Sequence, residues 1–205
     1  MKAIYGGTFD PPTLAHMAAA QAFHQALGQP ITWMPNHQSP LKGAASADGH
    51  RIAMLSEILD PDPRFDLSLL EMQRAGPSYT VDTLEQLRGD DPNQPLIWCL
   101  GGDSFNSIQQ WGRWQRLLDF ASLVVAARPG SRPAPPAEWT DRQCKLAHIT
   151  DHPSGYWCEI EMTQMDLASS RVRQAINNGQ PWQHWVAPAI AEYIKDNHLY
   201  VDEHG

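Results

Sequence analysis

A threonine and a histidine near the N-terminus have the types and the spacing to bind a phosphate group. Thr13 and His16 are three residues apart at the start of an expected helix, so both side chains should face whatever ligand lies there. Unpaired N–H groups and the helix dipole make a helix N-terminus favourable for an anion. Upstream, Gly6 and Gly7 let a phosphate approach the backbone without a Cβ in the way. Taken alone, this pattern still favours an ordinary strand, turn and helix with a surface histidine.

A second expected helix start, near residue 169, carries two serines and two arginines. Ser169 or Ser170 is expected to cap the helix, and Ser170 and Arg173 share one face. Arg171 points elsewhere, because residues two apart diverge on a helix, so we expect Arg173 to meet a phosphate beside the serine. The alternative is a plain capped helix with an exposed arginine.

Three further polar residues are candidates for ligand binding: two follow expected strands, and the third lies in a long polar loop. Asp103 and Arg128 each follow an apolar strand-like run, so both fall at the carboxyl ends of strands. Asp103 could bind a ribose hydroxyl or a metal-bound water, or it could cap the next helix. Lys42 is the only firm cation of the polar stretch 36–49, where a phosphate contact and a solvated surface lysine are about equally plausible.

The stretch 76–84 predicts a helix start that suits a carboxylate. Thr80 is expected to cap a helix that carries Val81 and Leu84, although a plain capped helix has the same pattern. Trp111 and Trp114 follow at helical spacing, which more often indicates core residues than a ligand stack.

These segments together resemble a known family. GGTFDPPTLAHM resembles the (His/Thr)-x-Gly-His signature of the nucleotidyltransferase superfamily, with Thr13 and His16 at its two variable ends. The string SYTVDTL resembles the Ser-Tyr-Thr-x-x-Thr-Leu segment of bacterial nicotinate-nucleotide adenylyltransferases. That family also has a Gly-x-Asp-Ser pattern with a later Trp, an Arg-Pro-Gly and an Ile-Ser-Ser-Thr-x-x-Arg motif. Their counterparts here are Gly101, Asp103, Ser104 and Trp111, then Arg128, then Ser169, Ser170 and Arg173.

The resemblance implies adenylyl transfer from ATP to nicotinic acid mononucleotide, which forms deamido-NAD and pyrophosphate, with Mg²⁺ held mainly by the ATP phosphates. Positioning and charge stabilisation then supply the catalysis, without a protein nucleophile. The implied catalytic residues are His16, Lys42 and Arg173. The implied ATP-binding residues are Gly6, Gly7, Thr8, Phe9, Thr13, His16, Gly101, Asp103, Ser104, Arg128, Ser169, Ser170 and Arg173. The implied nicotinate-binding residues are Ser78, Tyr79, Thr80 and Trp111.

Three positions depart from the family pattern. Thr13 replaces the more usual histidine, as it does in phosphopantetheine adenylyltransferases, and Ala15 stands where the signature has glycine. Leu41 occupies the place of a histidine that often precedes the lysine. Two alternatives therefore stay open. One is an adenylyltransferase that uses nicotinamide mononucleotide or phosphopantetheine, and the other is a nucleotide-binding homologue with impaired catalysis.

The elements that must position these residues alternate between strand and helix. Apolar runs predict strands at 2–5, 31–35, 65–70, 95–100, 121–127, 146–149 and 156–160, with the glycine pair ending the first. Helical periodicity predicts helices at about 13–27, from 48, from 80, from about 169, and at 186–200. In the second of these helices, Arg51 opposes the helix dipole, which hints at a partner. The alternation indicates a doubly wound parallel α/β sheet of the Rossmann-like kind.

Composition limits the class of protein. A chain of 205 residues that is 42% hydrophobic fits a single α/β domain, 1–205, with a C-terminal helical element at about 166–200. The net charge of −8 argues against a nucleic-acid partner, and the lack of eighteen consecutive apolar residues argues against a membrane partner. Three cysteines without a CxxC pair suggest the cytoplasm, and no zinc motif is present. A homo-oligomer is left open.

Overall fold

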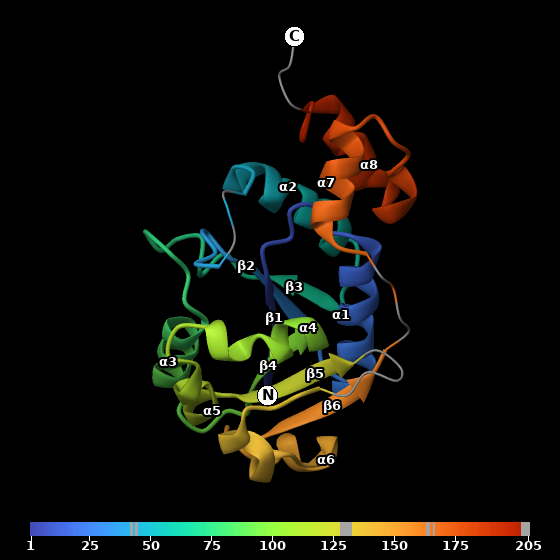
Figure 1. The fold of residues 1–205 in the computed structure, drawn as a ribbon. Coiled ribbons are helices and arrows are strands. Elements are labelled where there is room, and N and C mark those ends of the chain that lie inside the picture. The colour runs from blue at the N-terminus through green and yellow to red at the C-terminus, as the bar shows by residue number, and fades with distance from the viewer. Residues whose placement is uncertain (42, 44, 128–132, 163–164, 166, 202–205) are drawn as a thin grey trace.

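A computed structural model shows the chain as one parallel sheet with helices packed on both of its faces (Figure 1). The structure describes residues 1–41, 43, 45–127, 133–162, 165 and 167–201. The strand order is β3-β2-β1-β4-β5-β6, and every neighbouring pair is parallel. The strands are β1 (Lys2–Gly7), β2 (Ile31–Pro35), β3 (Phe65–Leu67), β4 (Leu96–Gly101), β5 (Ser122–Ala127) and β6 (Trp157–Glu161). The predicted doubly wound sheet is confirmed.

The order reverses between β1 and β4, which are neighbours in the sheet although they are far apart in the chain. Ala3 of β1 lies in register with Ile31 of β2 on one side and Ile97 of β4 on the other. The chain therefore leaves β1 and β4 in divergent directions at their shared carboxyl edge. In doubly wound sheets, this switch point is where ligands bind.

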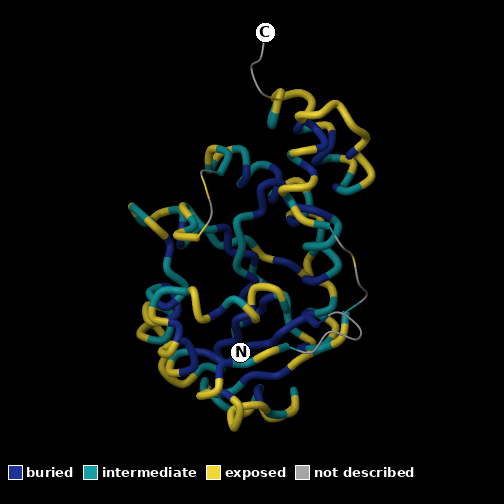
Figure 2. Tube along the Cα trace, viewed as in Figure 1, coloured by how far each residue is buried: buried dark blue, intermediate teal, exposed yellow. Residues whose placement is uncertain are grey.

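Side chains that alternate along the strands supply two cores. One core packs α1 (Leu14–Leu27), α2 (Asp48–Leu59) and α6 (Leu146–Ile149) on the face that carries Tyr5 and Trp33. The other packs α3 (Thr80–Asp90), α4 (Gly102–Asn106) and α5 (Leu117–Phe120) on the face that carries Ile4 and Trp98. Figure 2 shows burial concentrated along the strands and exposure on the outer sides of the helices.

The C-terminal helices form a third apolar cluster at one end of the molecule. α7 (Ser169–Asn177) and α8 (Pro188–Asp196) pack with Met54 of α2, and Ile190 and Ile194 are both buried. In Figure 1 these two helices lie beside α2, at the opposite end from α6. Four 3-10 segments complete the regular structure of the described residues: η1 (Ile108–Gln110), η2 (Trp114–Arg116), η3 (Ala137–Arg142) and η4 (Gln183–Trp185). Among the described helices, none combines the length and apolar character that a membrane crossing requires.

Two expectations about strands were wrong. β1 continues through Gly6 and Gly7 instead of breaking there, and Gly7 pairs with Pro35 of β2. Packing explains the glycines, because a Cβ on Gly6 would lie 2.1 Å from the Trp98 ring and one on Gly7 would lie 2.8 Å from the Phe9 ring. Residues 146–149 form helix α6, because residues 143–144 already pair with Trp157 at the edge of β6. β3 is also shorter than predicted and ends at Leu67.

Candidate active site

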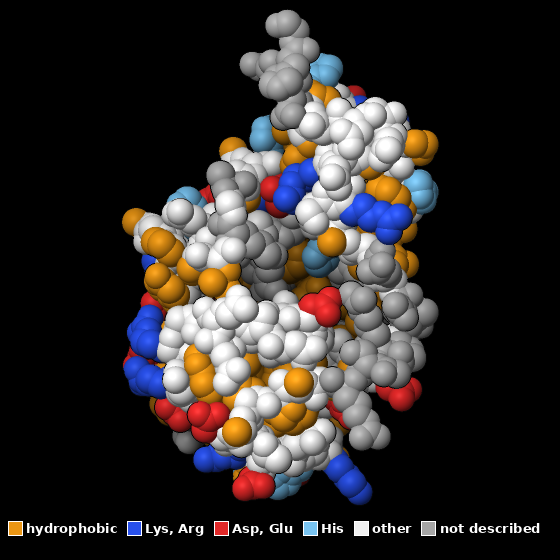
Figure 3. All heavy atoms as spheres, viewed as in Figure 1, with side chains coloured by type: hydrophobic (Ala, Val, Ile, Leu, Met, Phe, Trp, Pro, Cys, Tyr) orange, Lys and Arg blue, Asp and Glu red, His pale blue; other side chains and the backbone are white. Residues whose placement is uncertain are grey.

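A cavity of about 830 Å³ lies at the β1–β4 switch point, over the carboxyl edge of the sheet. Figure 3 shows this face hollowed between the C-terminal helices and the body of the sheet. Most of the predicted site residues line this one cavity. They are Gly6, Gly7, Thr8, Phe9, His16, Ser78, Tyr79, Thr80, Gly101, Asp103, Ser104, Trp111, Ser169, Ser170 and Arg173. Lys42 and Arg128 lie outside the described residues.

His16 is held in one tautomer by the residue that begins its helix. The backbone N–H of Thr13 donates to Nδ1 of His16 at 3.0 Å, and Oγ1 of Thr13 lies 2.8 Å from the same nitrogen. Because a backbone N–H can only donate, Nδ1 is an acceptor and the ring proton of the neutral imidazole sits on Nε2. Thr13 is only 1% exposed and lies behind His16 instead of facing the ligand space, so the expectation of two ligand-facing side chains was wrong.

Phe9 supports the His16 ring from the loop after β1. The two rings meet edge to face with centroids 5.3 Å apart, and Phe9 itself is buried. Phe9 has a φ of 51°, which is uncommon for a residue with a side chain and costs about 1–3 kcal/mol. Backbone strain of this kind clusters at functional sites, and here it occurs in the loop that carries the phosphate-binding pattern.

The start of α7 docks on the same loop. Oγ of Ser169 donates to the carbonyl of Pro11 at 2.8 Å, and the guanidinium of Arg173 donates to the carbonyl of Asp10 at 2.6 Å. The two phosphate-binding patterns therefore meet at one place although about 150 residues separate them in the chain. The N-cap is Ala168, so the expectation that a serine caps α7 was wrong; the Ser169 hydroxyl is used for docking instead.

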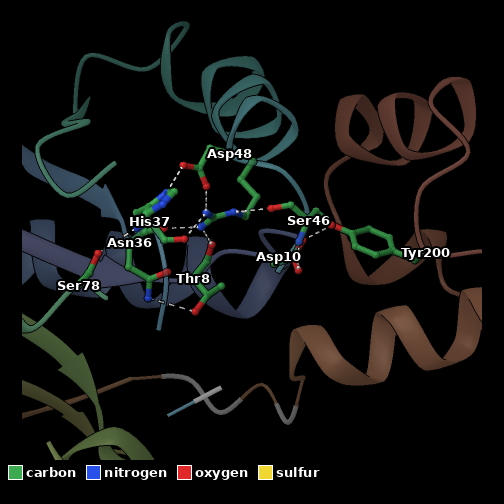
Figure 4. Close-up of polar contacts among 9 residues, drawn as sticks. Thr8, Asp10, Asn36, His37, Ser46, Asp48, Ser78 and Tyr200 are labelled. Atoms are coloured by element: carbon green, nitrogen blue, oxygen red, sulfur yellow. Dashed lines mark hydrogen bonds and ion pairs between the residues drawn. The ribbon is translucent and has the colours of Figure 1, made fainter. Parts of the chain in front are cut away.

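A buried arginine that sequence reasoning did not place in the site organises the loops around it. Arg51 of α2 is fully buried, and all five of its N–H donors are used. Its acceptors are the carbonyl oxygens of Ser46 (3.1 Å), Thr8 (3.0 Å), Asn36 (2.6 Å) and His37 (3.0 Å) and the carboxylate of Asp48. Figure 4 shows these groups converging from separate segments.

Arg51 joins the loop after β1 to the loop after β2. Asp48 neutralises its charge and also contacts Nδ1 of His37 at 2.5 Å. The N-cap of α2 is Ala47, and the Asp48 carboxylate pairs with Arg51 instead of capping the helix. The only signal in the sequence was a cation in the first turn of a helix, where the dipole disfavours it.

The start of α3 and the Trp111 segment form the other end of the cavity. Tyr79, not Thr80, is the N-cap of α3, so the expected capping residue is wrong by one position. The Ser78 hydroxyl accepts the backbone N–H of His37 at 3.1 Å, which ties this end to the loop after β2. Gly112 lies against the Tyr79 ring, where a Cβ would be 2.7 Å from Cδ1. Trp114 is buried, which confirms its predicted core role.

Comparison with known proteins assigns the chain to a family. The cytidylyltransferase-like family model matches residues 4–175. A probable nicotinate-nucleotide adenylyltransferase of Xylella fastidiosa (strain M12) is 34% identical, with 96% of this chain and 94% of the relative covered. One from Stenotrophomonas maltophilia (strain K279a) is also 34% identical, with 98% and 96% covered. The chain belongs to the nicotinate-nucleotide adenylyltransferase family.

Solved structures share the fold of this family member. The nicotinic acid mononucleotide adenylyltransferase of Plasmodium falciparum complexed with NaAD superposes with a TM-score of 0.75 at 20% identity, covering 98% of both chains. The same enzyme complexed with APC gives a TM-score of 0.71 at 18% identity, covering 97% of this chain and 96% of the other. At these identities the likeness establishes the fold.

Two residues by which this adenylyltransferase family member departs from the pattern also line the cavity. Ala15 precedes His16 in the lining, and Leu41 is 52% exposed at its rim. Asp103 lies in the first turn of α4, whose N-cap is Gly101, so it does not take the capping role that was the alternative. Leu41 therefore presents an apolar side chain to the space that a ligand would enter.

Glu71 is a further lining residue that sequence reasoning missed. It is 4% exposed and accepts a 2.7 Å hydrogen bond from the Thr83 hydroxyl, which also accepts one from Arg74 at 3.2 Å. Burial raises the pKa of Glu71, and the Thr83 hydrogen bond and the Arg74 charge oppose that effect. A buried carboxyl in the cavity wall thus links the loop after β3 to α3, and no spacing rule in the sequence marks it.

Proposed function

We propose that this protein transfers the adenylyl group of ATP to nicotinic acid mononucleotide, forming deamido-NAD and pyrophosphate. The observation that carries the proposal is that one cavity joins two phosphate-suited helix starts to a third helix start beside Trp111. The names of the full-length relatives support the same reaction. A phosphate oxygen of the acceptor attacks the α-phosphorus of ATP, and the bond to the bridging oxygen breaks as pyrophosphate leaves with the electron pair.

On this proposal, the protein contributes hydrogen-bond donors that face the developing negative charge. His16 donates through Nε2–H, because Thr13 occupies Nδ1. Arg173 and the first N–H groups of α7 bind the phosphates from the other side. Lys42 and Arg128 complete the proposed phosphate contacts on the strength of the family resemblance. Removing a donor of this kind typically costs about 10²–10³ in turnover.

The acceptor would bind at the start of α3. Its carboxylate would face the positive end of the α3 dipole, near the Tyr79 and Thr80 backbone, an interaction worth about 0.3–1 kcal/mol when exposed and up to about 2 kcal/mol when partly buried. Trp111 would stack on the pyridine ring for about 0.5–1.5 kcal/mol. A carboxamide lacks the charge, so this end of the cavity favours the nicotinic acid form.

The residues present fit a magnesium ion that is bound mainly by nucleotide phosphates. Within the described ranges, no group of three or more His, Cys, Asp or Glu side chains is arranged to hold a metal. Asp103 at the cavity wall could reach a water bound to such an ion. When bound, the ion would neutralise phosphate charge. We also propose that residues 1–205 act as one domain, with the element at about 166–200 supplying Arg173 to the cavity.

The test is pyrophosphate release from ATP and Mg²⁺ with three acceptors in parallel: nicotinic acid mononucleotide, nicotinamide mononucleotide and phosphopantetheine. We expect kcat/KM to be highest for the nicotinic acid form. Preference for another acceptor would support adenylyl transfer but refute nicotinic acid mononucleotide as the substrate. Leu41 at the rim would then be the first residue to test for acceptor choice. ATP binding without release for any of the three would refute the reaction in favour of a binding-only homologue.

A further inference from the structure

Asp10 is a buried carboxylate at the point where three distant segments meet. It is 4% exposed and lies in the loop after β1, within the cavity lining. Oδ2 accepts the backbone N–H of Ser46 at 3.1 Å, and the Asp10 carbonyl accepts the Arg173 guanidinium at 2.6 Å. A buried charge is costly unless hydrogen bonds compensate it, so the second carboxylate oxygen also needs a donor.

That donor comes from the end of the chain. The Tyr200 hydroxyl donates to Oδ1 of Asp10 at 2.7 Å, as Figure 4 shows. Tyr200 has a φ of 64°, an unfavourable backbone conformation for a residue with a side chain, so the contact is made at a conformational cost. Burial and the neighbouring Asp10 carboxylate raise the pKa of Tyr200, so its proton stays available for the bond.

We propose that Tyr200 is a positioning residue that keeps the Asp10 carboxylate engaged and thereby leaves the Arg173 guanidinium free to bind ATP phosphates. The proposal rests on the proposed adenylyl transfer and adds a role for the C-terminal residues. Arg173 already contacts the Asp10 backbone, so its guanidinium lies close to a carboxylate that has lost its Tyr200 partner. Carboxylate and triphosphate would then compete for one arginine.

This competition for Arg173 should weaken ATP binding and leave the binding of the acceptor unchanged. The acceptor residues proposed above lie at the start of α3 and around Trp111, where Ser78 bonds the loop after β2 and the Tyr79 ring lies against Gly112. Those contacts do not involve Asp10 or Tyr200. A general loss of stability would instead change both substrates together, so the split between them separates positioning from mere structure.

The experiment compares Tyr200→Phe with Tyr193→Phe. Both variants delete one phenol hydroxyl from the C-terminal segment, but Tyr193 pairs with Nδ1 of His50 at 3.0 Å and neither residue lines the cavity. Calorimetric Kd for ATP and the KM of each substrate are measured together with thermal melting. We expect Tyr200→Phe to raise the ATP Kd and KM about tenfold, as for a lost hydrogen bond to a charged group, with the acceptor KM unchanged. Tyr193→Phe should stay within about twofold of wild type for both substrates.

A double-mutant cycle with Asp10→Asn tests whether Tyr200 acts through the Asp10 charge. In that background, Tyr200→Phe should change the ATP Kd by less than about twofold. Equal effects in both backgrounds, or an unchanged ATP Kd in the single variant, would overturn the inference while leaving the proposed function intact. If Tyr200→Phe fails to fold, the inference is tested by Asp10→Asn alone, whose ATP Kd must not show the same tenfold weakening. A wild-type protein that binds no ATP would overturn the proposed function and this inference together.

Discussion

Replacing Arg51 with lysine should cost far more stability than a surface exchange of the same kind. Arg51 donates five hydrogen bonds inside the protein, whereas a lysine ammonium has three donors. At least two buried acceptors then lose their partner, at about 1–3 kcal/mol each, so the free energy of unfolding should fall by roughly 2–6 kcal/mol. For a chain of this size that corresponds to a melting temperature lower by roughly 4–24 °C.

The matched control is Arg64→Lys. Arg64 pairs with Asp62 at 2.6 Å, but its side chain is 43% exposed, so water can replace what the lysine does not supply. Thermal and urea unfolding of both variants measure the difference, with pyrophosphate release below either melting point as a second readout. Arg51→Lys should also lower turnover, because the Thr8 and Asn36 carbonyls are no longer held together. If Arg51→Lys melts within about 2 °C of Arg64→Lys, the argument that a saturated buried guanidinium organises the site is refuted.

Two further predictions concern the acceptor end of the cavity. Gly112→Ala would place a Cβ 2.7 Å from the Tyr79 ring, so steady-state kinetics should show an acceptor KM about tenfold higher and an unchanged ATP KM. Gly89→Ala in α3, where a Cβ meets open space, should change neither KM, and an equal effect of the two substitutions would contradict the reasoning. Glu71→Gln should become more stable relative to wild type as the pH rises. Burial raises the pKa of Glu71 above 4.5 in the folded protein. The stability that the protonated carboxyl contributes to wild type is therefore fully present below pH 4.5 and is lost as the pH rises through the raised pKa, whereas glutamine does not titrate. Urea unfolding across this range measures the difference, and a flat difference would contradict the argument.

Local patterns predicted much of the architecture because the central strands β4 and β5 have continuous apolar runs and the main helices have a clear period. Apolar runs such as 96–100 are typical of a buried parallel strand, and the polar residues that follow such strands meet at one edge of the sheet. The strand predicted at 146–149 was wrong because the segment is too short for periodicity to decide. Its four residues, two of them large and apolar, fit a strand and a helical turn equally well.

Contacts between distant segments were beyond the reach of local patterns. Local sequence provided only a hint that Arg51 has a partner, because nothing in its neighbourhood shows that four carbonyl oxygens from two loops converge on it. Thr13 was expected to face the ligand, but its backbone N–H donates to Nδ1 of His16, which places the threonine behind the ring. Tyr200 and Asp10 are separated by 190 residues, so their contact depends on how α8 packs on α2.

The proposed chemistry rests most directly on His16, and one measurement tests it. His16→Ala is compared with wild type for pyrophosphate release with nicotinic acid mononucleotide and ATP, together with thermal melting of both proteins. We expect a loss of about 10²–10³ in kcat, because the Nε2–H donor that Thr13 fixes is removed. We also expect the variant to stay folded with a melting temperature lower by only a few degrees, because the ring lines the cavity and its removal leaves one N–H, that of Thr13, without its partner. Turnover close to wild type in a folded His16→Ala protein would contradict the assignment of this cavity as the reaction site.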